Sequence, residues 1–136
     1  MIIDTNVVLD VLLGRDAFVG NAARIFSLVE RSEVEGLLCA TTITTVDYLL
    51  CQSLSRKEAR QTLRQLIEIF EVAAVNRSVI EGALRGAIAD FEDAVMAEAG
   101  RLAGADAVVT RNAKDFQKGA IKAVDPAEFL AGFKGR

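Results

Sequence analysis

Short apolar runs alternate along this chain with longer stretches whose apolar residues recur at helical spacing. The apolar runs lie at residues 2–3, 37–40, 72–75 and 107–110, and residues 121–124 form a candidate edge strand. Strands that alternate with helical stretches are typical of βαβ units, in which helices join parallel strands. The sequence therefore predicts an α/β fold with a short, mostly parallel central sheet.

The stretches between these runs predict the helices. We expect helices over residues 7–13, 21–30, 41–50, 55–70, 78–87 and 90–103, a loop over residues 111–116, and a last helix that begins at Pro126. Ser55 and Glu58 have the spacing of a capping box, and Ser78 is the expected N-cap of the fifth helix. Each cap would satisfy a backbone amide that a helix start leaves without a partner.

Composition limits the class of protein. The chain has 136 residues, of which 51% are hydrophobic and 26% are charged, as in an ordinary globular protein, and we expect one domain over residues 1–136. No apolar run approaches the roughly 20 residues needed to cross a bilayer, and none resembles a signal peptide, so we expect a cytoplasmic protein without membrane contact. Cys39 and Cys51 are too few for a disulfide framework and are expected to be buried.

Charge and the choice of residue types limit the chemistry. The net charge is −3, which argues against a protein that binds nucleic acid through surface charge alone, since such proteins are basic. Histidine is absent, which excludes the Ser-His-Asp and Cys-His arrangements and most zinc sites. Any chemistry must then depend on carboxylates, which are the ligands that hard cations prefer.

Asp4 directly follows the apolar pair Ile2-Ile3, so its side chain is expected at the carboxyl end of the first strand. In open α/β sheets, ligands bind at this edge. A carboxylate buried there needs a cation or another partner, because burying an unpaired charge is costly. The alternative is a turn residue that makes only local hydrogen bonds.

Three more acids lie on predicted helices. Asp47 is a candidate site residue, with the alternative of a solvated position in the first turn of its helix, where acids suit the helix dipole. Asp90 and Asp93 are one turn apart and can share a helix face. Asp90 is better explained as an N-cap, whereas Asp93 suits a metal ligand.

The predicted loop after the fourth strand carries the remaining candidates. Asp115 lies there as a site residue or as a loop cap, and Thr110 and Asn112 are candidate turn and cap residues. Arg111 and Lys114 are either part of a solvated edge or contacts to a phosphate group.

Asp4, Asp47, Asp93 and Asp115 would repel one another if they met without a counter-charge, because like charges a few Å apart cannot all ionise cheaply. Bound Mg²⁺ or Mn²⁺ would remove that penalty, lower the pKa of a water ligand and stabilise the oxygens of an in-line displacement at phosphorus. In a chain without histidine, this pattern favours phosphodiester hydrolysis by metal-activated water.

The order of these motifs resembles that of PIN-domain ribonucleases, and most of all that of bacterial toxins of the VapC type. The resemblance rests on residues 1–7, on a threonine-rich helix start that carries Asp47, and on residues 90–95 and 109–116, so that it spans nearly the whole chain. It implies a three-layer α/β/α sandwich and a Mg²⁺- or Mn²⁺-dependent endoribonuclease that is the toxin of a toxin-antitoxin pair. It also implies an RNA substrate, an antitoxin partner and a homodimer.

The resemblance also implies roles for individual residues. The catalytic acids of the family fall on Asp4, Asp47, Asp93 and Asp115, with Asp4, Asp93 and Asp115 as metal ligands. Supporting positions fall on Asn6, Asp90, Thr110 and Asn112. Asp47 departs from the family, in which the second acid is usually Glu, and a side chain one methylene shorter reaches a metal less directly.

Two alternatives stay open. A non-catalytic binding module can use the same scaffold, since fold does not determine function. A phosphatase of the haloacid-dehalogenase type also begins with an apolar strand and an Asp, but it needs a second acid two residues later, where this chain has Asn6. Divalent-metal affinity separates the nuclease from the module, because only the nuclease is expected to lose it when Asp4 or Asp93 becomes Asn.

Overall fold

A five-stranded parallel sheet forms the centre of the protein in a computed structural model that describes residues 1–133. Its strands are β1 (Ile2–Ile3), β2 (Leu37–Cys39), β3 (Glu71–Ala73), β4 (Ala107–Val109) and β5 (Lys122–Val124), in the spatial order β3-β2-β1-β4-β5. Every pair of neighbouring strands is parallel. The predicted α/β fold is confirmed; the last three residues of the expected domain, 134–136, lie outside the described part of the chain.

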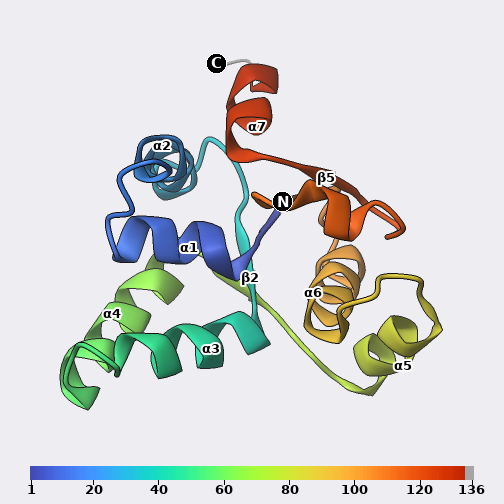
Figure 1. Ribbon diagram of the computed structural model, residues 1–136, viewed down its shortest axis with the longest axis horizontal. Coiled ribbons are helices and arrows are strands. Elements are labelled where there is room, and N and C mark those ends of the chain that lie inside the picture. The colour runs from blue at the N-terminus through green and yellow to red at the C-terminus, as the bar shows by residue number, and fades with distance from the viewer. Residues whose placement is uncertain (134–136) are drawn as a thin grey trace.

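Seven α-helices and one short 3₁₀ helix connect and flank the strands in residues 1–133 (Figure 1). They are α1 (Thr5–Leu12), α2 (Val19–Glu30), α3 (Ala40–Leu50), α4 (Arg56–Ile69), α5 (Arg77–Arg85), α6 (Phe91–Leu102), the 3₁₀ helix η1 (Ala113–Phe116) and α7 (Pro126–Gly132). Within this part of the chain, no helix combines the length and the apolarity that a membrane-spanning segment needs.

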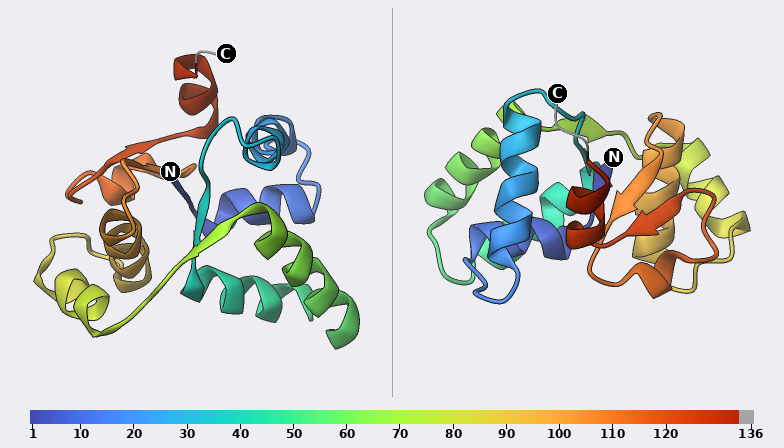
Figure 2. Two further views of the ribbon diagram at one scale, coloured as in Figure 1. Left: turned by 180° about the vertical axis from the view of Figure 1, so that it is seen from behind. Right: turned by 90° about the horizontal axis from the view of Figure 1, so that it is seen from above.

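The sheet separates two apolar cores, because successive side chains of a strand point to opposite faces. Ile3 belongs to the core beneath α1 to α4, whereas its neighbour Ile2 belongs to the core beneath α5 and α6. The helices accordingly lie in two groups on either side of the strands, and α7 packs beside α2 (Figures 1 and 2). This arrangement is the three-layer α/β/α sandwich that the resemblance implies.

Small side chains let α6 lie close to the sheet. Ala94, Ala97 and Ala99 are buried in the second core, and a Cβ atom added to Gly100 would stand only 2.7 Å from Cγ2 of Ile2. That distance is far below van der Waals contact, so even a methyl group at position 100 would force Ile2 or the helix to shift. The close approach brings the first turn of α6 next to the end of β1.

Local signals located most helix ends. The Ser55 hydroxyl accepts a hydrogen bond from the Glu58 amide at 3.1 Å, and the Glu58 carboxylate accepts one from the Ser55 amide at 3.2 Å, as a capping box requires. The prediction of Ser78 as an N-cap was wrong, because the Asn76 side chain accepts the hydrogen bond from Val79 and α5 begins one residue earlier than Ser78.

Two other expectations need correction. The segment 111–116 is not all loop, because residues 113–116 form η1 and bury Phe116 beneath the sheet. Cys39 is buried as expected, but Cys51 is exposed at the end of α3, where the chain turns toward α4.

The strand order fixes where a ligand can bind. The chain starts at β1, adds β2 and β3 on one side, and then crosses to β4 and β5 on the other. Sheets of this kind bind ligands at the carboxyl ends of the strands where the direction of winding reverses, which here is between β1 and β4. Asp4 follows β1 and Thr110 follows β4, so both lie at this point.

Candidate functional site

Asp4 lies at the centre of this edge, in the N-cap position of α1 and only 7% exposed. Its backbone amide donates a 2.9 Å hydrogen bond to the carbonyl of Val109, and its Oδ2 accepts a 2.7 Å hydrogen bond from the Thr110 hydroxyl. Burial raises the pKa of the Asp4 carboxyl, against the lowering effect of the hydrogen bonds from Thr110 and from the Thr5 amide. The protein therefore retains a carboxylate in a place where its charge is poorly solvated.

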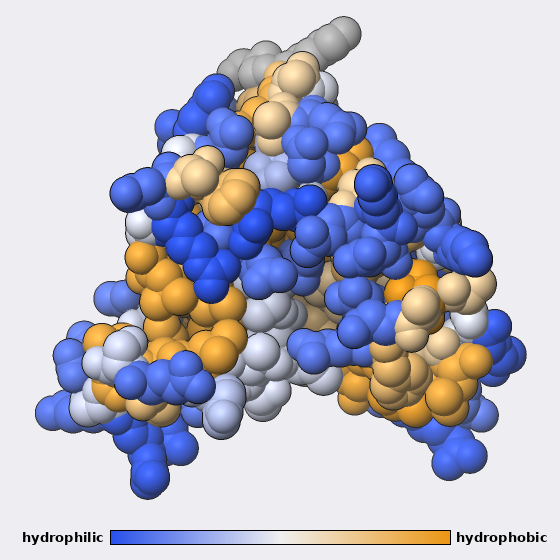
Figure 3. Space-filling view, in the orientation of Figure 1, coloured by the Kyte–Doolittle hydropathy of each residue, from blue (hydrophilic) through white to orange (hydrophobic). Residues whose placement is uncertain are grey.

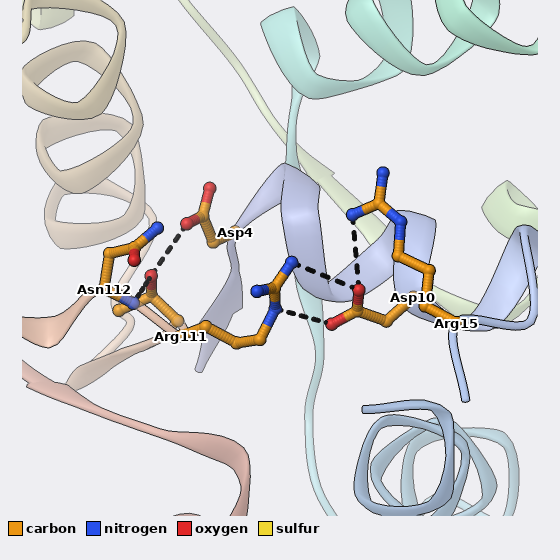
Figure 4. A network of polar contacts seen from close by, with 6 residues as sticks. Asp4, Asp10, Arg15, Arg111 and Asn112 are labelled. Atoms are coloured by element: carbon orange, nitrogen blue, oxygen red, sulfur yellow. Dashed lines mark hydrogen bonds and ion pairs between the residues drawn. The ribbon is translucent and has the colours of Figure 1, made fainter. Parts of the chain in front are cut away.

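Thr110 is itself held in position. Its hydroxyl oxygen accepts a 3.0 Å hydrogen bond from the Asn112 amide, and its own amide donates to the carbonyl of Val124. With Asn112 as its donor, the hydroxyl has its own hydrogen free for Asp4. Of the two predicted supporting positions, Thr110 therefore contacts Asp4 directly, and Asn112 contacts Thr110 (Figure 4).

Asp93 approaches Asp4 from the first turn of α6, which Asp90 caps by accepting a 2.9 Å hydrogen bond from the Asp93 amide. The Asp93 side chain is half-buried. Burial raises its pKa to about 7, together with the negative charges of Asp90, Asp4, Asp115 and Glu92. The predicted N-cap role of Asp90 is confirmed, and the charges of Asp4 and Asp115 both act on Asp93.

The η1 segment supplies the outer part of this edge. Asp115 is exposed, and its amide donates a 2.9 Å hydrogen bond to the carbonyl of Asn112. Asn112 and Lys114 are exposed as well. Asn6 is half-buried in the first turn of α1, two residues beyond Asp4.

Asp47 forms no hydrogen bond with Asp4, Asp93 or Asp115 in the described part of the chain. It is not in the first turn of its helix, because α3 begins at Ala40, and its Oδ1 accepts a 3.9 Å hydrogen bond from the Cys51 thiol one turn later. Its charge is not among the causes of the raised pKa of Asp4 or of Asp93.

Glu92 is the acid that sequence reasoning missed. Its negative charge raises the pKa of both Asp4 and Asp93, and its Oε1 accepts a long 3.5 Å hydrogen bond from the Thr45 hydroxyl of α3. The sequence did contain a hint of this role, because Glu92 directly precedes the candidate site residue Asp93 in an acidic helix start.

The Arg111 side chain extends away from Asn112 toward Asp10, in a polar network near Asp4 (Figure 4). Its Nε and Nη2 donate to the two carboxylate oxygens of Asp10 at 2.8 and 3.3 Å, and its guanidinium carbon lies 3.9 Å from the centre of the Phe18 ring. Arg15 Nη1 donates to Asp10 Oδ1 at 3.3 Å. The guanidinium predicted as an RNA contact is thus already bound within the protein, whereas Lys114 is exposed.

The donor chemistry of the edge suits a hard cation. Asp4, Asp93, Asp115 and Thr110 offer only oxygen atoms, which Mg²⁺ and Mn²⁺ prefer to nitrogen or sulfur. In residues 1–133, however, no group of three or more acidic or cysteine side chains is arranged to hold a metal ion.

Several solved toxin-antitoxin proteins have the same fold as this chain. A toxin-antitoxin complex from Klebsiella pneumoniae contains a chain 21% identical to this one, with a TM-score of 0.69 over 92% of this chain and 96% of that chain. DNA-bound VapBC from Salmonella typhimurium gives 16% identity and a TM-score of 0.71 over 92% and 96% of the two chains. VapBC-1 from nontypeable Haemophilus influenzae gives 16% identity and a TM-score of 0.69 over 93% and 97%.

No curated protein matches the chain in sequence. At these identities the solved structures establish the fold alone. A family model does match the sequence itself: the model of the PIN domain covers residues 1–114, from β1 through β4 and into η1. This match includes Asp4, Asp93 and Thr110, the residues that the structure gathers at the switch point between β1 and β4. The chain belongs to the PIN-domain family.

Proposed function

We propose that this protein is a Mg²⁺- or Mn²⁺-dependent endoribonuclease, the toxin of a toxin-antitoxin pair that acts in the cytoplasm. The observation that carries the proposal is the place of Asp93, where burial and the nearby charges of other carboxylates raise its pKa to about 7. A protein keeps such repelling charges together mainly where they have a task, since perturbed titration is typical of functional sites. Membership of the PIN-domain family supports the same reading.

Asp4, Asp93 and Asp115 would hold the metal ion, with Asp47 as a fourth acid that acts through water. A bound Mg²⁺ or Mn²⁺ supplies an activated water ligand and offsets the charge of the phosphate. Thr110 fixes the rotamer of Asp4 through its 2.7 Å hydrogen bond, and Asn6 and Asn112 line the same edge. Below pH 7 Asp93 holds a proton that it must release before it can bind a cation.

RNA must approach an edge that is itself acidic in a chain of net charge −3. The exposed Lys114 of η1 lies next to Asp115 and is the cation best placed to contact a phosphate. A divalent ion bound by the carboxylates would reverse the sign of the local field. Arg111, which Asp10 holds, would act on RNA only through its positive charge.

An antitoxin partner and a homodimer are part of the proposal. The neighbours from Klebsiella and Haemophilus come from a toxin-antitoxin complex and from VapBC-1. Leu13 and Tyr48 are 47% and 69% exposed near α1 and α3, and Leu84 and Phe91 are 68% and 46% exposed near α5 and α6. Figure 3 shows apolar side chains over these two regions with mostly polar surface between them. Two separate apolar regions suit two different protein contacts.

The proposal is tested with purified protein and a mixed RNA pool. Cleavage is measured with Mn²⁺, with EDTA and with the Asp93→Asn variant, while Glu68→Gln, on the exposed side of α4, is the matched control. We expect cleavage that needs Mn²⁺, that Glu68→Gln retains and that Asp93→Asn loses. A folded wild-type protein that neither cuts RNA nor binds Mn²⁺ would instead support the non-catalytic module.

A further inference from the structure

Asp10 is a charged residue in an apolar position. It lies on α1 after the buried residues Val7, Val8 and Leu9, and none of its surface is exposed. A buried carboxylate is destabilising unless ion pairs and hydrogen bonds compensate it. Asp10 therefore needs well-placed ion-pair and hydrogen-bond partners, and the identity of these partners indicates its role.

The main partner comes from the far end of the chain. Arg111 is 101 positions from Asp10 in sequence and donates to both of its carboxylate oxygens, at 2.8 and 3.3 Å. A two-point contact between a planar guanidinium and a carboxylate fixes direction as well as distance. The Phe18 ring, 3.9 Å from the guanidinium carbon, closes the other side. Only 24% of the Arg111 side chain is exposed.

In sequence, Arg111 lies between Thr110 and Asn112, two residues of the edge that carries Asp4. The preceding residue, Thr110, donates to Asp4, and the following residue, Asn112, donates its amide to the Thr110 hydroxyl. The segment after β4 is thus attached twice to one short piece of chain, through Thr110 to Asp4 at the start of α1 and through Arg111 to Asp10 further along α1 (Figure 4).

We propose that Asp10 is a positioning residue for the proposed metal site: by holding Arg111, it sets the segment 110–112 so that the Thr110 hydroxyl is aimed at Asp4. The inference rests on the proposed function as far as the metal is concerned, whereas the positioning of residues 110–112 is independent of it. Residues behind metal ligands orient those ligands, and their loss typically weakens metal binding about 10- to 100-fold.

A purely structural ion pair would behave differently. It would stabilise the whole domain, and any substitution that keeps both charges would serve equally well. The positioning role depends on the fork geometry of Arg111, which lysine cannot reproduce. Arg15 supplies a matched control, because it donates to the same carboxylate but through one nitrogen at 3.3 Å, and it lies in the segment between α1 and α2.

The experiment compares Arg111→Lys with Arg15→Lys in two measurements on the full chain. Amide hydrogen exchange at Asn112 reports the local geometry, and calorimetry with Mn²⁺ reports the metal site. We expect Arg111→Lys to lose protection of the Asn112 amide at least about tenfold and to weaken Mn²⁺ binding about tenfold or more. We expect Arg15→Lys to change either quantity less than about twofold.

Where wild type binds Mn²⁺, equal behaviour of the two variants in either measurement would overturn the proposal. Should wild type bind no Mn²⁺, the proposed function fails, and exchange at Asn112 alone then decides whether Asp10 positions the segment. Should Arg111→Lys not fold, Asp10→Asn serves as the second variant, because it keeps the shape of the side chain and removes its charge; the same loss of Asn112 protection is expected.

Discussion

The Thr110 hydroxyl donates a 2.7 Å hydrogen bond to Asp4 Oδ2 and so joins the ends of β1 and β4 across 106 positions of sequence. Asp4 is almost fully buried, and this bond lowers its pKa against the effect of burial. The bond therefore keeps a poorly solvated carboxylate available in its charged form.

Thr110→Val, which keeps the shape and removes the hydroxyl, leaves Asp4 without this donor. We expect the free energy of unfolding to fall by about 1–3 kcal/mol at neutral pH, the effect of leaving a buried acceptor unpaired. Denaturant titration measures the change. Thr44→Val is the control, since the Thr44 hydroxyl only donates to the Thr41 carbonyl on an exposed helix face, and it should change stability by less than about 0.5 kcal/mol.

Asp93 makes the stability of the metal-free protein depend on pH. Its folded-state pKa of about 7 lies above the ordinary value of 3.8, so between these values the folded protein binds a proton that the unfolded chain has released. The stability that this proton contributes is complete below pH 3.8 and is lost as the pH rises through 7.

Thermal unfolding in EDTA across this pH range tests the linkage. We expect Asp93→Asn, which cannot ionise, to gain stability relative to wild type as the pH rises, with an advantage of a few degrees in Tm above neutral pH. Mn²⁺ should reverse the order there, because it stabilises only a protein that binds it. A constant difference between the two proteins at all pH values would contradict a raised pKa of Asp93.

The capping box of α4 makes a third prediction, away from the acidic edge. Ser55→Ala removes the hydroxyl that accepts a hydrogen bond from the Glu58 amide and should lower the free energy of unfolding by about 1 kcal/mol. Ser53→Ala, in the turn before α4, is the control and should stay within about 0.5 kcal/mol. Both variants should bind Mn²⁺ as wild type does; a weaker Mn²⁺ affinity in Ser55→Ala alone would show that α4 contributes to the site.

Short sequence patterns predicted the features that depend only on neighbouring residues, such as helix caps. The caps at Ser55 and Asp90 were confirmed, since each side chain accepts a hydrogen bond from the backbone amide three residues later. The prediction of Ser78 as an N-cap was wrong because Asn76, two residues earlier, accepts the hydrogen bond from the Val79 amide. Which of the two side chains caps the helix depends on the path of the backbone after β3. The sheet rule located Asp4, because this residue directly follows β1.

The remainder of the site depends on pairings that sequence spacing does not encode. Asp10 was not among the predicted site residues, and its partner Arg111 lies 101 positions away in the sequence. Glu92 raises the pKa of Asp4 and of Asp93 through its charge, whereas Asp47 is not among the causes of either shift. Because α3 begins at Ala40, Asp47 lies beyond its first turn and contacts Cys51.

The contact between Gly100 and Ile2 gives the last prediction, because it sets how closely α6 carries Asp93 to the end of β1. Alanine favours a helix by about 1 kcal/mol over glycine, but its Cβ at position 100 would stand 2.7 Å from Cγ2 of Ile2, which is fully buried in a short strand and cannot move aside freely. Overpacking of this kind costs about 1–3 kcal/mol, so we expect Gly100→Ala to be destabilising on balance and to weaken Mn²⁺ binding by shifting Asp93.

Gly20→Ala is the matched control, since Gly20 is also helical and a Cβ there meets no atom within 4 Å. It should leave stability unchanged or raise it by up to about 1 kcal/mol. Denaturant titration and Mn²⁺ calorimetry of the two variants compare the effects directly. If Gly100→Ala were as stable as Gly20→Ala and bound Mn²⁺ equally well, the close approach of α6 to β1 would not be what brings Asp93 to Asp4.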